Sequence, residues 1–224
     1  MNDDVDFDLF MRRTQSRLLA RAIMYCGNRQ NAEDAVQEAY IEAFRHWSTL
    51  ESPAAWLETT MRRRLARHAR RWWSGRGRFE LELPVPAAAT VEEEADALAV
   101  LRAIGQLPAR QRQVLIRICL EGMSYRQVAD ELGISAGAVG ANLSKARAKL
   151  ATLLELDPAA PRPGDPLVVS PTIDRNRPTG RQDPLVPMLS AAEAWLVRGL
   201  ESDPGGLDRL RAAVWSAVGE RRPG

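Results

Sequence analysis

The chain of 224 residues has 31 Lys and Arg against 29 Asp and Glu, so its formal net charge of +2 indicates no particular class of partner. Its 45% content of apolar residues is ordinary for a globular protein, and its length suits one or two small domains. No apolar run approaches the roughly 18 residues that a membrane-spanning helix needs. The acidic start MNDDVDFD lacks the basic residues that open a signal peptide. We therefore expect a cytoplasmic protein.

Catalytic and metal-binding patterns are missing from the sequence. Cys26 and Cys119 stand alone among apolar residues, without a CxxC or a Cys/His cluster at zinc spacing, so we interpret both as buried thiols. His46 and His68 lack nearby partner residues, and no GxSxG, HExxH or phosphate-loop motif occurs. The sequence therefore predicts a binding protein that is not an enzyme and takes no metal and no cofactor.

Helical periodicity recurs along the chain and strand signals are almost absent, which predicts an all-α fold. Asn31 is the predicted N-cap of the second helix, with Asp34 at its third position. Ser52-Pro53 is predicted to open the third helix, because Pro is favoured at the first helical position. The predicted helices are 7–26, 31–47, 54–73, 91–105, 109–121, 125–132, 136–150, 190–201 and 207–220.

Charges of one sign gather in blocks. Residues 62–78 contain eight Arg and no acid, and residues 80–96 contain six acids and no base, which favours a nucleic-acid face followed by a solvated linker. Interleaved Arg and Trp side chains suit a single nucleic-acid strand, although arginines over a Trp-containing core would give the same pattern. The second predicted helix carries a polar, acidic ridge beside its apolar stripe, and the pattern alone does not separate this ridge from a solvated face.

Residues 123–150 predict a helix-turn-helix. Ser124 and Gln127 fit a capping box, Gly133 suits a left-handed helix end, and Ser135 can cap the second helix. Basic residues and no acids on that second helix favour a phosphate-lined groove, although a helical hairpin in a core would share the pattern. Its apolar side is Val139, Leu143, Ala146 and Leu150.

Residues 157–187 contain eight Pro, which predicts an extended or disordered tether. Two short helices follow on either side of Asp203-Pro204-Gly205-Gly206, the first opening with a capping box at Ser190. Because these helices are too small to fold alone, they need a surface to dock on. Our hypothesis is a regulatory element whose Trp195 and Trp215 helices dock on the preceding domains or on a partner, and its alternative is a poorly ordered appendage.

The order of these parts resembles an extracytoplasmic-function sigma factor of the sigma-70 family. NAEDAVQEAYIEAFRHW is similar to region 2.2 of that family, SPAAWLETTMRRRLARHARR to regions 2.3 and 2.4, and LPARQRQVLIRICLEGMSYRQVADELGISAGAVGANLSKARAKL to region 4. The resemblance implies region 2 at 1–75, an acidic and Pro-containing linker at 76–90 and region 4 at 91–155. The rest of the chain is outside the family pattern, and its composition and periodicity predict a Pro-rich disordered tether at 156–188 and a helical extension at 189–221.

The resemblance also implies partners and site residues. The basic β′ clamp helices of core RNA polymerase would bind the acidic ridge. The β flap of the polymerase would contact a face of this chain that includes Leu115 and Ile118. An anti-sigma factor is a further partner of such proteins. The ridge is Asp34, Gln37, Glu38 and Glu42. Melting and binding of the −10 promoter element would fall to Arg62, Arg63, Arg64, Arg67, Arg70, Arg71 and Trp72. The −35 element would be read by Ser135, Ala138, Asn142, Lys145, Arg147 and Lys149.

Two departures from the family pattern stand out. Arg63 occupies a position where many relatives carry Asn, and residues 138–142 read Ala-Val-Gly-Ala-Asn where relatives usually have Thr-Val-Lys-Ser-Arg. We therefore expect an altered −10 preference and weak −35 contacts. The leading hypothesis is an alternative sigma factor that directs promoter-specific initiation. Its alternative is a helix-turn-helix transcription regulator that acts without replacing the sigma subunit.

Overall fold

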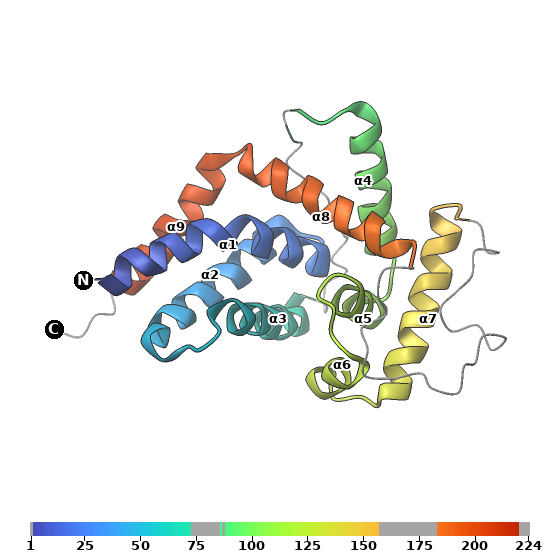
Figure 1. The fold of residues 1–224 in the computed structure, drawn as a ribbon, viewed down its shortest axis with the longest axis horizontal. Coiled ribbons are helices and arrows are strands. Elements are labelled where there is room, and N and C mark those ends of the chain that lie inside the picture. Colours follow the sequence, from blue (N-terminus) through green and yellow to red (C-terminus); the bar gives the residue numbers. More distant parts are fainter. Residues whose placement is uncertain (1, 73–85, 87, 157–182, 220–224) are drawn as a thin grey trace. The chain divides into compact units, whose positions relative to one another are not determined.

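A computed structural model describes residues 2–72, 86, 88–156 and 183–219 (Figure 1). The chain divides into two compact units, Met1–Thr90 together with Glu193–Gly224, and Val91–Ala192. Across the described ranges the secondary structure is helical, which confirms the all-α prediction. None of the described helices is long and apolar enough to cross a membrane. The helices are α1 (Asn2–Cys26), α2 (Arg29–Arg45), the 3-10 turn η1 (Trp47–Thr49), α3 (Pro53–Trp72), α4 (Val91–Gly105), α5 (Ala109–Cys119), α6 (Tyr125–Leu132), α7 (Ala136–Leu153), α8 (Leu185–Glu201) and α9 (Pro204–Gly219).

In the first unit, α2 is the central helix. It packs against α1, α3 and α9, so three helices cover it from different sides. Its buried stripe is built largely of alanines, which let neighbouring backbones approach closely. The buried residues of α2 are Ala32, Ala35, Val36, Ala39, Tyr40 and Ala43.

Three predicted helix limits in the first unit are wrong. Helix α1 begins at Asn2, five residues before its predicted start at residue 7. The N-cap of α2 is Asn28, whose Oδ1 accepts from the backbone N–H of Asn31 at 2.9 Å, so Asn31 already lies inside the helix. Asn28 can cap because its backbone is extended, with φ −140° and ψ 126°. At its other end α2 stops at Arg45, and the chain tightens into η1 before Pro53 opens α3 as predicted.

The second unit contains α4 to α7, and its helix-turn-helix is formed as predicted. The Ser124 backbone N–H donates to Gln127 Oε1 at 2.8 Å, and the Gln127 N–H donates to Ser124 Oγ at 3.3 Å, which completes the capping box. Gly133 ends α6 with φ +63°, a conformation that glycine adopts without strain. Ser135 caps α7, whose buried side is the predicted one. Helix α5 ends at Cys119, two residues before its predicted end.

The C-terminal helices begin earlier than predicted. Helix α8 opens at Leu185, whose N–H donates to Asp183 Oδ1 at 3.1 Å, so the predicted capping box at Ser190 is wrong. Pro187 lies in the first turn, where a helix needs no N–H donor. Likewise Asp203 caps α9 by accepting from Gly206 N–H at 3.2 Å, and the helix starts at Pro204. Most of the predicted linker at 76–90 and of the predicted tether at 156–188 lies outside the described residues.

Candidate nucleic-acid interface

The acidic ridge lies on the side of α2 that is turned away from its buried stripe. Asp34 is exposed, Gln37 is half-buried, and the side chains of Glu38 and Glu42 are 40% and 30% exposed. Arg64 of α3 lies between the last two: it ion-pairs with Glu38 at 3.3 Å and also with Glu42. The structure therefore brings the predicted polymerase-binding ridge and one predicted DNA-binding arginine into a single charged cluster.

The described arginines of α3 differ in their exposure to solvent. Arg62 is buried, donates to Thr59 Oγ1 at 3.0 Å and lies 3.9 Å from a Glu58 carboxylate oxygen. Arg63 and Arg67 are exposed. Arg62 therefore has a structural partner inside the unit, whereas Arg63 and Arg67 present charge to solvent. The side chains of Arg70, Arg71 and Trp72 lie outside the described residues.

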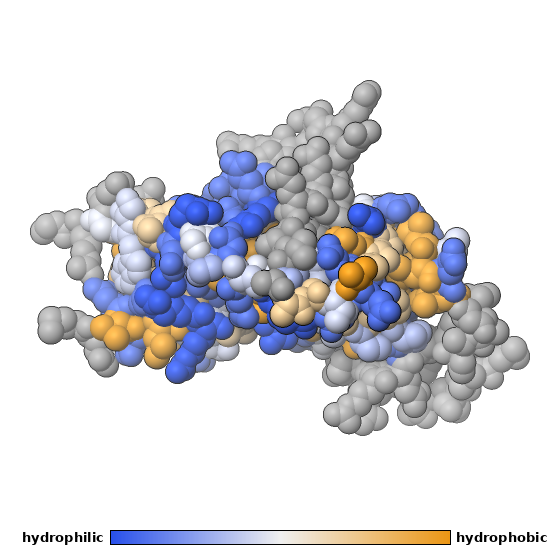
Figure 2. All heavy atoms as spheres, turned by 90° about the horizontal axis from the view of Figure 1, so that it is seen from above, coloured by the Kyte–Doolittle hydropathy of each residue, from blue (hydrophilic) through white to orange (hydrophobic). Residues whose placement is uncertain are grey.

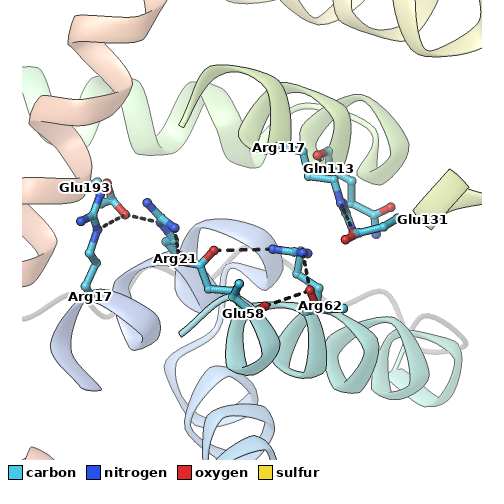
Figure 3. A network of polar contacts seen from close by, with 10 residues as sticks. Arg17, Arg21, Glu58, Arg62, Gln113, Arg117, Glu131 and Glu193 are labelled. Atoms are coloured by element: carbon cyan, nitrogen blue, oxygen red, sulfur yellow. Dashed lines mark hydrogen bonds and ion pairs between the residues drawn. The ribbon is translucent and has the colours of Figure 1, made fainter. Parts of the chain in front are cut away.

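Arg62 belongs to a buried polar network that the sequence did not predict (Figure 3). Arg21 of α1, with a side chain only 5% exposed, donates to Glu58 at 2.5 Å and to Glu193 at 2.6 Å. Arg17 lies 3.6 Å from the same Glu193 oxygen. Two carboxylates thus balance the charge of a buried arginine, and one of them comes from α8. Arg21 has apolar neighbours in the sequence of α1, and that local sequence does not predict a buried ion pair.

On α7, the second helix of the helix-turn-helix, the predicted DNA-binding residues fall into two groups. Ser135 and Lys145 are exposed and Ala138 is half-buried, while the Asn142 amide donates to the Ala138 carbonyl at 2.8 Å within the helix. The other two have partners elsewhere in their unit. Arg147 ion-pairs with buried Asp183 at 2.5 Å, and Lys149 Nζ donates to the Gln106 carbonyl at 2.5 Å.

The predicted flap-facing side chains Leu115 and Ile118 are in the core of the second unit, 0% and 2% exposed. That part of the flap prediction is wrong, because the apolar positions of α5 pack against α6 and α7. The same helix buries Arg117, whose Nε donates to Glu131 Oε2 of α6 at 3.2 Å. This ion pair joins α5 to the first helix of the helix-turn-helix (Figure 3).

Few described residues offer chemistry beyond binding. Burial raises the pKa of the Cys119 thiol to about 12, despite the nearby Arg147 charge. Cys26 is half-buried. Within the described residues no group of three or more His, Cys, Asp or Glu side chains is placed to hold a metal ion. The surface in Figure 2 is mostly hydrophilic with separate apolar patches, and the large apolar side chains exposed in the described chain are Val5, Leu9 and Val91.

Family models match both units. The description "Sigma-70 region 2" applies to residues 10–74, which span α1 to α3 and so include the acidic ridge and the described arginines. The description "Sigma-70, region 4" applies to residues 97–150, which include the helix-turn-helix. The match to region 2 separates this chain from regulators that carry a helix-turn-helix alone.

Individual relatives agree with the family models. The chain is 29% identical over 154 residues to the RNA polymerase sigma-E factor of Streptomyces coelicolor, covering 67% of this chain and 86% of the relative. It is 30% identical over 155 residues to the ECF RNA polymerase sigma factor SigM of Mycobacterium tuberculosis, covering 68% and 79%. Among solved structures, the sigma factor RpoE of Bartonella quintana, crystallised with the anti-sigma factor NepR, aligns with a TM-score of 0.51 and 28% identity, covering 68% of this chain and 98% of RpoE. The chain belongs to the extracytoplasmic-function sigma factors of RNA polymerase, within the sigma-70 family.

Proposed function

We propose that this sigma factor binds core RNA polymerase through the acidic ridge of α2 and opens promoter DNA through the arginines of α3. The observation that carries the proposal is the placement of opposite charges on two neighbouring helices of one unit. Asp34, Glu38 and Glu42 lie on α2, Arg63 and Arg67 are exposed on α3, and α2 and α3 pack together. A ridge of carboxylates suits basic helices such as those of the polymerase clamp.

Promoter melting in this proposal needs no catalytic group and no ATP. Unstacking a base costs about a few kcal/mol, and contacts to the displaced strand offset that cost. Arg63 and Arg67 are the described candidates for phosphate contact, and Arg70, Arg71 and Trp72 remain predictions for the same strand. We assign Arg62 a structural role, because its guanidinium is buried against Glu58.

Recognition of the −35 element falls to α7, which would enter the major groove as the second helix of a helix-turn-helix does. Lys145 is the exposed base for a phosphate contact, and Ser135, Ala138 and Asn142 lie at the front of the helix. Arg147 and Lys149 would have to leave Asp183 and Gln106 to reach DNA. We therefore expect a modest contribution of the −35 contacts to affinity.

The proposed function also implies where the chain acts and which class of protein regulates it. Because the polymerase and the chromosome share the cytoplasm, the chain acts there, as a binding protein without catalysis of its own. We propose an anti-sigma factor as the class of regulator, since RpoE of Bartonella quintana was crystallised with one.

A charge-reversal experiment tests the polymerase contact. Asp34→Lys with Glu38→Lys should reduce core polymerase affinity at least 100-fold in the full chain, because two attractive charges become repulsive. The matched control is Glu92→Lys with Asp96→Lys, an exposed acidic pair with the same spacing of four residues on α4. Equal affinity of the ridge variant, the control and the unmodified chain would refute the proposed contact.

A further inference from the structure

The C-terminal helix α9 lies against α1 and α2 in the first unit (Figure 1). We propose that α9 is a permanent structural helix of the polymerase-binding unit and stays in place when the chain binds core polymerase. The polymerase part of this inference rests on the function proposed above. The surface that receives α9 is called the α9 seat here, and consists of Phe7 and Asp8 of α1 with Arg29 and Phe44 of α2.

The apolar part of the contact is centred on Trp215. Its ring centroid is 5.9 Å from that of Phe7 and 5.5 Å from that of Phe44, both in edge-to-face arrangements. Such ring geometry is the favourable one for aromatic pairs. Leu210 and Val214 of α9 are buried alongside. Helix α9 therefore packs through an aromatic anchor against both α1 and α2.

Polar contacts fix the position of α9 along the seat. The Trp215 indole N–H donates to Asp8 Oδ1 at 3.2 Å, and Arg211 lies 4.0 Å from the same oxygen. At the other end of the helix, Arg29 of α2 donates to Asp203 Oδ2 at 3.0 Å. The hydrogen bond from Arg29 lowers the pKa of Asp203, and the Gly206 N–H lowers it further. The helix is thus fastened at both ends, and sliding it by one turn would break both contacts.

Gly206 makes the fit specific. A Cβ atom at this position would lie 2.5 Å from an Arg29 nitrogen and 2.6 Å from Asp203 Oδ2, so a side chain there would require the ends of both ion-paired side chains to shift. At the neighbouring Gly205, a Cβ atom would meet its nearest atoms at ordinary contact distances of 3.5 and 3.8 Å. Two adjacent glycines therefore differ in whether docking allows a side chain.

The docked helix and the carboxylates of the acidic ridge use different sides of α2. Glu38 follows Arg29 by about two and a half turns, so these two residues lie on opposite sides of the helix. Phe44, at about four turns from Arg29, returns to the side of α9. Asp34 stays exposed with α9 in place. Gln37 of the ridge precedes Phe44 by about two turns, so it lies on the side of α9, and it is half-buried. Asp34 and Glu38 lie away from that side, so binding of polymerase to these two carboxylates does not require the helix to leave.

The family models end at residue 150, so helix α9 is an addition of the present chain to the family pattern. The sequence left open whether the extension docks on the preceding domains or on a partner, and the structure places α9 on α1 and α2. The regulatory role stays a prediction, and in our proposal α9 is a stable component, not an inhibitor that polymerase displaces.

Cutting the chain tests the proposal. A protease recognition sequence is placed within residues 157–182, and the purified full-length chain is cleaved there. We expect the two pieces to elute together and to bind core polymerase together in equal amounts. Separation of the pieces before polymerase is added, or release of the C-terminal piece when polymerase binds, would overturn the proposal. If neither the cut nor the uncut chain binds polymerase, the proposed function falls, and this inference falls with it.

Matched variants show which contact holds the C-terminal piece. Gly206→Leu should weaken retention of the piece at least tenfold, whereas Gly205→Leu should change it less than twofold. Trp215→Ala should also weaken retention at least tenfold. Arg147→Ala, which removes the ion pair of Asp183 with α7 inside the second unit, should leave the piece bound. Equal retention by the two glycine variants, or release by Arg147→Ala, would refute docking through the α9 seat.

Discussion

Arg21 Nε donates to Glu193 Oε1 at 2.6 Å, and this hydrogen bond joins α1 to α8 across 172 positions of sequence. Both side chains are buried, at 5% and 9% exposure. A charge in such a place is stable only with its partner present. The C-terminal extension therefore supplies a counter-ion that the region 2 fold of this chain needs.

Loss of that counter-ion should destabilise the first unit. We expect Glu193→Ala to lower its free energy of unfolding by about 3 kcal/mol, because Arg21 would be left buried with Glu58 alone. Arg17→Ala should cost less than about 1 kcal/mol, since Arg17 touches the same carboxylate from a position 65% exposed. All six Trp residues belong to the first unit, so tryptophan fluorescence during urea unfolding reports on it alone. Equal losses in the two variants would contradict a buried role for Arg21.

The arginines of α3 should separate into a structural and a DNA-binding class. Arg63→Ala and Arg67→Ala should each reduce the slope of log affinity against log salt by about 0.7, the value for one phosphate contact to a single strand. Arg62→Ala should leave that slope unchanged and lower the stability of the first unit. The measurement is binding of the holoenzyme to a promoter fragment with a premelted −10 element at several salt concentrations. An Arg62 variant that lowers the slope as Arg63→Ala does would show that the burial of Arg62 is not maintained on DNA.

Two glycines of the helix-turn-helix should respond oppositely to alanine. Gly133→Ala should destabilise the second unit by about 1 kcal/mol, because φ is +63° there and a Cβ atom is strained in that region. Gly137→Ala should stabilise it by about 0.5 to 1 kcal/mol, since this glycine lies inside α7 with only Ser135 Oγ within 4 Å of the added atom. Thermal unfolding followed by circular dichroism compares them. Destabilisation by Gly137→Ala would mean that the helix needs a glycine at that position.

The two cysteines should differ in reactivity towards iodoacetamide. Only the thiolate reacts, and a pKa of about 12 leaves about one Cys119 thiol in 10,000 ionised at pH 8. Cys26 is half-buried and should be alkylated first. Because burial raises the Cys119 pKa above its ordinary value of 9.0, this thiol contributes stability below pH 9 that is lost as the pH approaches 12. Mass spectrometry of the alkylated chain identifies the order, and faster labelling of Cys119 would contradict its burial.

Local signals in the sequence were sufficient for the helix-turn-helix. Ser124, Gln127, Gly133 and Ser135 each act on backbone groups within a few residues, so their spacing alone determines the caps and the turn. The same holds for Pro53 at the start of α3. Asn28 and Asn31 show the limit of such signals, because either Asn could cap α2 and only the path of the incoming chain decides between them.

Contacts between distant segments were not predictable from spacing. The pairing of Arg21 with Glu193 and of Arg147 with Asp183 depends on where α8 lies, and nothing in residues 185–201 encodes that place. The sequence did predict that the C-terminal helices need a surface, because they are short and amphipathic. It could not identify the α9 seat, since Phe7 and Phe44 read as ordinary core positions of their own helices.

The central claim, that this chain gives core RNA polymerase a promoter specificity, is tested most directly by run-off transcription with purified core polymerase on genomic fragments. We predict initiation at defined start sites that depends on the chain, is lost with Asp34→Lys and Glu38→Lys together, and persists with Glu92→Lys and Asp96→Lys together. A chain that does not join core polymerase, or that joins it without directing initiation at any site, would contradict the account.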